Sequence, residues 1–113
     1  MTPEQERLLR RLALNDECLV TAVFGDVAAS EDSGLPAKTL ALIRIAALIA
    51  TESALASYQW AVDNALAVGV REAEIIDAVL AVAPIVGSAR VTSAASDLAM
   101  ALGYDVDPRS EDS

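Results

Sequence analysis

The sequence predicts an all-α protein of one structural domain that assembles with copies of itself. Three observations carry this prediction. Apolar residues recur at helical spacing along most of the chain, and no stretch shows the alternation of a convincing strand. Helix start and stop signals separate six such segments. The third segment is apolar on nearly every face, and a chain of 113 residues has little core with which to bury it.

The first two helices are expected in residues 1–25. Thr2 is a suitable N-cap, Pro3 fits the first helical position, and Gln5 completes the spacing of a capping box. The helix restarts at residues 15–17 and ends at a glycine, before a loop rich in small and acidic residues that continues to Pro36.

The third helix should run from Pro36 or Ala37 to about Thr51, with Arg44 as its exception to apolar character. A helix that is hydrophobic all round must be buried on all sides. Burial against a second subunit is the simplest explanation. The sequence therefore predicts a homo-oligomer.

Three further helices complete the prediction. The fourth runs from about Ser53 to Gly69, and the fifth begins near Arg71 and should kink or end at Pro84. The sixth opens at residues 87–88 and closes before Gly103. Inward positions of the fifth helix are expected at Ile75, Ile76, Val79, Leu80 and Val82.

Composition narrows the classes of function. A formal net charge of −9 argues against nucleic acid and anionic membrane surfaces as partners, because both need basic patches. No run reaches the roughly 18 apolar residues of a membrane span. The N-terminus lacks a signal-peptide pattern, which favours a cytoplasmic protein. Cys18 is the only cysteine, so it is read as a small buried hydrophobe without a disulfide partner.

Residues 35–106 resemble the carboxymuconolactone decarboxylase-like family, which also holds the alkylhydroperoxidase D enzymes. The resemblance depends on the order and spacing of several pieces: Leu35–Thr39 leading into Leu42–Ala50, Ser57–Val62, Ala67–Val70, Ile75–Leu80 leading into Ala83–Gly87, and Ala101–Val106. It implies a six-helix, all-α fold around a central helical hairpin, assembled as a homotrimer or homohexamer. The chain then divides into N-terminal helices and an acidic loop (1–34), the family-like domain (35–106) and a flexible acidic tail (107–113).

The residues that carry chemistry in that family are missing here. By the resemblance, the two cysteines of the peroxidase branch fall at Ala54 and Ser57, and the histidine of both branches falls at Ala61. The activating glutamate falls at Leu42, or at Ala41 if the register slips by one. Thiol peroxidase activity is therefore not expected. With no histidine and a single cysteine, a zinc or redox-metal site is not expected, and no cofactor is predicted.

A modest set of polar and aromatic residues remains near the family's pocket. Arg44, Glu52 and Tyr58 are the candidate catalytic residues, and Trp60 and Ala61 the candidate pocket residues. Arg44 suits a carboxylate anchor, since its planar fork binds carboxylate in a bidentate way. The structural alternative for Arg44 is an ion pair with Asp77 or Glu74. Tyr58 and Trp60 can equally be core or interface aromatics, and Glu52 a residue at a helix N-terminus.

Two functions follow from this set. The first is a family member without the redox and proton-transfer residues, acting as a small-ligand-binding or structural oligomer. The alternative is a cofactor-independent lyase, decarboxylase or isomerase that acts on a small lactone or carboxylic acid in a pocket at a subunit interface. In that alternative Arg44 holds the carboxylate, while Glu52 or Tyr58 supplies the proton.

Overall fold

A computed structural model of the chain describes residues 1–15 and 34–104. The chain divides into two compact units, residues 1–34 and residues 35–113. The second predicted helix, Cys18 and the predicted acidic tail lie outside the described residues. Within the described ranges every regular element is a helix and no strand occurs, in agreement with the predicted all-α class.

The first unit contains helix α1 (Pro3–Ala13), which begins as predicted. The Oγ1 atom of Thr2 accepts a hydrogen bond from the backbone N–H of Gln5 at 3.1 Å, and the Oε1 atom of Gln5 accepts one from the backbone N–H of Thr2 at 2.9 Å. This capping box satisfies two backbone donors that a helix start leaves unpaired. Every described residue of this unit is exposed, including the leucines at positions 8, 9 and 12.

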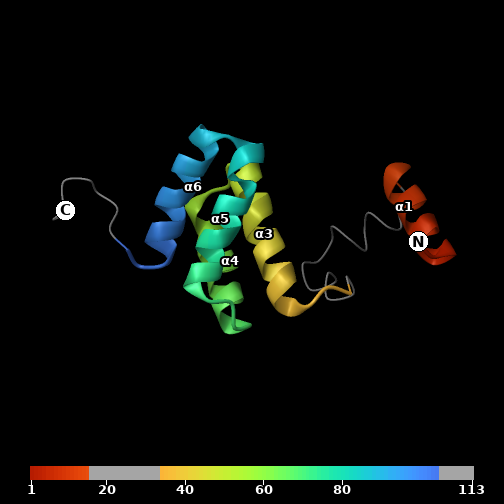
Figure 1. Cartoon of the computed structure of the whole chain (residues 1–113), viewed down its shortest axis with the longest axis horizontal. Helices are drawn as coiled ribbons and strands as arrows, with labels where there is room; N and C mark the ends of the chain where they lie inside the picture. The colour runs from red at the N-terminus through yellow and green to blue at the C-terminus, as the bar shows by residue number, and fades with distance from the viewer. Residues whose placement is uncertain (16–33, 105–113) are drawn as a thin grey trace. The chain divides into compact units, whose positions relative to one another are not determined.

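The described part of the second unit, residues 35–104, is a bundle of four helices, whose bounds are α3 (Ala37–Thr51), α4 (Leu55–Ala67), α5 (Glu72–Val86) and α6 (Ser88–Ala101). Helix α3 packs against α4 and α5, and α6 packs against the same two helices from across the bundle (Figure 1). Helices α3 and α4, joined by residues 52–54, form a helical hairpin. The core is built from side chains of all four helices and the turn after α4: Ala41, Ile45, Ile49, Tyr58, Ala61, Val62, Ala65, Val70, Ile75, Ala94 and Leu98.

Helix α3 buries one face and exposes another. Ala41, Ile45 and Ile49, spaced four residues apart, are at most 1% exposed. Ile43 is 48% exposed and Ala47 is also exposed, so the opposite face stays open to solvent in one copy. The apolar surface from which self-association was predicted is therefore only partly covered by the other helices of the bundle.

Helix α5 differs from the expectations at Pro84 and on its inward positions. Of the two outcomes expected at Pro84, an end of the helix does not occur, because α5 continues to Val86 before Gly87 turns the chain with a φ of 88°. In addition, Ile76 and Leu80, which were expected to point inward, are 56% and 66% exposed. Ile75 is buried in the core, whereas Ile76 lines an open groove between α5 and α6 and Leu80 is exposed outside that groove.

Candidate functional site

Arg44 of α3 and Trp60 of α4 lie together. The guanidinium carbon of Arg44 is 5.9 Å from the centroid of the Trp60 ring, within the range of a cation–π interaction. Trp60 is 49% exposed, and beside it Leu48, Ala56, Ser57 and Trp60 line a shallow hollow. A cation over an aromatic face at the edge of an open hollow can hold a flat anionic group.

Glu74, one of the two acids expected to pair with Arg44, pairs with Arg71 instead. The Oε1 atom of Glu74 accepts a hydrogen bond from the backbone N–H of Arg71 at 2.9 Å and lies 3.3 Å from its Nε atom. The pKa of Glu74 is lowered, chiefly by this backbone hydrogen bond and then by the Arg71 side chain and charge and that of Lys38, while partial desolvation opposes the shift. Glu74 therefore caps the N-terminal end of α5.

Glu52 lies at the C-terminal end of α3, where it was expected to begin the next helix. It caps α3 in the left-handed conformation, with φ 54° and ψ 51°. Its Oε1 atom is 3.7 Å from the Nε atom of Arg90, and both side chains are about half exposed. Ion pairs of this exposed kind contribute about 1 kcal/mol at most. Glu52 does not line the hollow beside Trp60.

Tyr58 is a core residue whose hydroxyl group is already engaged. The side chain is 1% exposed, and its hydroxyl donates a hydrogen bond to the backbone carbonyl of Leu48 at 3.1 Å. Burial raises the pKa of Tyr58, and the negative charges of Asp97 and Glu52 raise it further. A neutral hydroxyl that donates to a backbone carbonyl is poorly suited to give its proton to a substrate.

The positions expected for the family's catalytic residues have different surroundings. Ala61, the histidine position, is 1% exposed and belongs to the core, so it does not line the hollow beside Trp60. Ser57, the second cysteine position, does line that hollow, and Ala54 is exposed one turn earlier. Of the five predicted site residues, Arg44 and Trp60 are therefore brought together, whereas Glu52, Tyr58 and Ala61 contact other partners.

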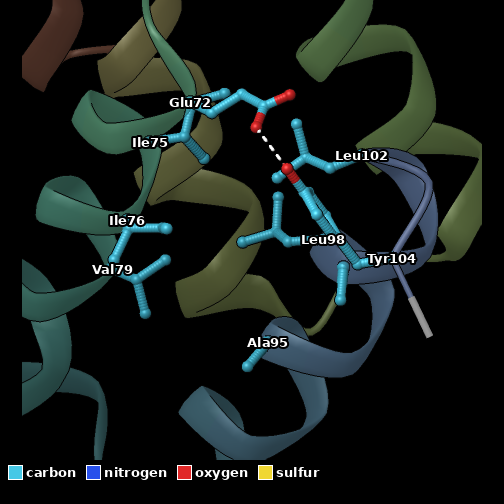
Figure 2. Close-up of a pocket in the computed structure, with 9 residues that line it drawn as sticks. Glu72, Ile75, Ile76, Val79, Ala95, Leu98, Leu102 and Tyr104 are labelled. Carbon is cyan, nitrogen blue, oxygen red and sulfur yellow. Dashed lines mark hydrogen bonds between the residues drawn. The ribbon is translucent and has the colours of Figure 1, made fainter. Parts of the chain in front are cut away.

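An apolar groove lies between α5 and α6 (Figure 2). Its volume is about 390 Å³, and aliphatic side chains make up most of its wall. From α5 come Glu72 and three branched residues, and from α6 and the following turn come small and apolar residues; the full lining is Glu72, Ile75, Ile76, Val79, Ala95, Leu98, Ala99, Leu102 and Tyr104.

A polar pair closes one end of this groove. The hydroxyl group of Tyr104 donates a hydrogen bond to the Oε2 atom of Glu72 at 2.8 Å (Figure 2). This bond and the negative charge of the carboxylate raise the pKa of Tyr104. The pair joins the start of α5 to the residue that follows α6, so the groove has an apolar wall and a single polar rim.

Sequence reasoning missed this groove, although one signal was present. Ala95 and Ala99 are four residues apart on α6 and line the groove together with the branched residues of α5. Where small side chains lie opposite large ones, the two helices leave a space between them that larger side chains would fill. The sequence analysis placed Ile75 and Val79 in the core, and only the packing of the helices reveals the space between them and α6.

Comparison with known proteins gives one result for the family. The model described as carboxymuconolactone decarboxylase family matches residues 18–100. Neither the curated proteins nor the solved structures gave a match. Among residues 1–15 and 34–104, no helix has the length and apolar character to cross a membrane, and no three potential metal ligands come together.

Proposed function

Because this chain belongs to the carboxymuconolactone decarboxylase family, we propose that it is a member without the family's chemistry, which binds a small apolar molecule in the groove between α5 and α6. The observation that carries the proposal is the groove itself: about 390 Å³ of space with an aliphatic wall and one polar rim. Pockets that bind small molecules are concave and mostly apolar, with a few polar groups that fix orientation.

The candidate acids and bases support a binding function over a catalytic one. The hydroxyl group of Tyr58 is engaged with a backbone carbonyl, and Glu52 is engaged with Arg90. Ala61 leaves the expected histidine position without a titratable group, and its surroundings are core side chains. An enzyme of this class needs a titratable group within hydrogen-bond reach of its substrate.

The groove predicts the chemistry of its ligand. Burial of apolar surface in the groove supplies the attraction, and only the surplus over the cost of association appears as affinity, so weak binding of a small apolar molecule is expected. The carboxylate of Glu72, with its Tyr104 partner, favours a neutral ligand with a hydrogen-bond donor at one end. An anionic ligand is disfavoured at this rim.

Filling the groove should remove binding. In a fluorescence titration with the neutral apolar dye Nile red, Ala99→Phe is expected to raise the dissociation constant at least about tenfold, since the added ring occupies the space of the ligand. Ala73→Phe, at an exposed position of α5 that does not line the groove, is the matched control and should leave it unchanged. Equal affinity of the two variants contradicts the assignment of the groove.

Self-association into a homotrimer or homohexamer is the second part of the proposal. Helix α5 exposes Leu80 and Ile85 at 66% and 84%, and Ile43 of α3 is 48% exposed. Burying one such side chain against another subunit contributes about 1.5–3 kcal/mol. Self-association would remove these large apolar side chains from water.

A charged side chain in place of Leu80 should dissociate the assembly. In sedimentation velocity at micromolar concentration, wild-type protein is expected to sediment as an oligomer and Leu80→Glu as smaller particles, because the new carboxylate loses its water in the contact. Gln59→Glu adds the same charge at an exposed position of α4 and is expected to behave as wild type. A wild-type chain that sediments as a monomer contradicts this part of the proposal.

The alternative function is a cofactor-free lyase, decarboxylase or isomerase that acts on a small lactone or carboxylic acid. It is favoured by the position of Arg44 over Trp60, next to the hollow that Ser57 lines. Turnover of carboxymuconolactone-like substrates by the wild type, lost in Arg44→Ala, supports this alternative. Absence of turnover together with dye binding in the groove supports the binding function.

A further inference from the structure

Helix α1 carries an apolar face that is open to solvent. Its leucines at positions 8, 9 and 12 are 45–57% exposed, and together with Met1 and Gln5 they line a continuous hollow along the helix. A helix of 11 residues is marginally stable in water without packing partners. This face is therefore suited to packing against another surface.

The charged side chains along one edge of this face change from acidic to basic between the first and the last turn of α1. Glu4 lies in the first turn of α1, and Arg11, seven residues later, lies in the last turn. Seven residues complete nearly two helical turns, so both side chains lie along the same edge of the leucine face. They line one hollow together with Arg7 and Leu8. This edge is acidic at one end and basic at the other.

We propose that α1 pairs with α1 of a second copy in an antiparallel arrangement. In such a pair the same edges of the two helices meet in opposite directions, as in antiparallel coiled coils, so Glu4 of each copy lies opposite Arg11 of the other. The contact has two-fold symmetry and is closed after two copies. A parallel pair instead brings the acidic first turns together and the basic last turns together.

The leucines and the charged side chains contribute to this contact in different ways. The apolar face supplies the attraction, because its three leucines leave water when the helices meet. Exposed ion pairs add little affinity, but like charges at the same positions disfavour the wrong arrangement. The charge order of α1 is complementary to its own reversed copy, which identifies a second copy of this chain as the partner.

The test is a charge exchange in the full-length chain, followed by sedimentation velocity. Glu4→Arg and Arg11→Glu are each expected to weaken the α1 contact about tenfold and to shift the particles toward smaller assemblies, since each places like charges at both crossings. An equimolar mixture of the two variants should restore the wild-type mass, because unlike charges then meet twice.

The double variant Glu4→Arg/Arg11→Glu is the matched control. It reverses the charge order within one copy, keeps the net charge, and is expected to retain the wild-type mass. Circular dichroism should show equal helix content in all variants. Single variants with unchanged mass, or a mixture that does not recover it, overturn the proposal and indicate that another surface covers the leucines. Nile red binding in the groove is independent of either outcome.

Discussion

Replacing Ala61 by histidine is expected to lower the free energy of unfolding by roughly 2–6 kcal/mol and to leave the chain without decarboxylase activity. About 1–3 kcal/mol comes from forcing a larger side chain into a packed core, and about 1–3 kcal/mol from burying ring nitrogens without partners. Ala61 is 1% exposed and lies among core residues such as Val62 and Ala65. Urea unfolding followed by circular dichroism measures the loss.

Gln59→His provides the control for this experiment. Gln59 is exposed on the same helix, so the same new side chain should change the free energy of unfolding by less than about 0.5 kcal/mol. The informative contrary result is Ala61→His with wild-type stability and measurable turnover of a carboxymuconolactone-like substrate. Such a result requires an intact catalytic pocket that lacked only its proton carrier, and it favours the alternative function.

Shortening Ile45 to alanine is expected to cost about 2–5 kcal/mol, while the same change at Ile43 costs under about 1 kcal/mol in a single copy. The two positions belong to one helix and carry the same residue, but Ile45 is fully buried and Ile43 is 48% exposed. The first substitution leaves a cavity between α3 and its neighbours. Urea unfolding at several protein concentrations measures both losses.

The dependence of the stability losses on protein concentration distinguishes Ile43 from Ile45 further. The stability of an oligomer depends on protein concentration, because association stabilises the folded state. If Ile43 lies in a contact between copies, the loss caused by Ile43→Ala should be larger at high concentration than after dilution, whereas the loss at Ile45 should persist. Equal losses at the two positions at every concentration contradict the packing described for α3.

Local signals in the sequence determined the helical elements and most of their ends. The Thr2–Gln5 spacing gave the capping box of α1, and Gly69, with a φ of 93°, marks the turn after α4. These features depend on neighbours within four or five residues, so the sequence contains all the information they require. The apolar pattern of residues 37–51 likewise predicted a helix there, and α3 occupies those residues.

The site depended on contacts between helices, which local patterns do not contain. Tyr58 and Trp60 are two residues apart on one helix, yet Tyr58 is buried with its hydroxyl bonded to Leu48, while Trp60 is half exposed under Arg44. Helical periodicity alone did not decide which of the two faced the core.

The sequence by itself determined that the chain is helical and that it lacks histidine and a cysteine pair. Only the tertiary structure decided that Ile75 is buried while Ile76 is exposed, and that Ala95 and Ala99 leave a groove opposite α5. The physical reason is that a helix records in its own sequence which residues are apolar, whereas the side on which each is buried depends on the neighbours that pack against it.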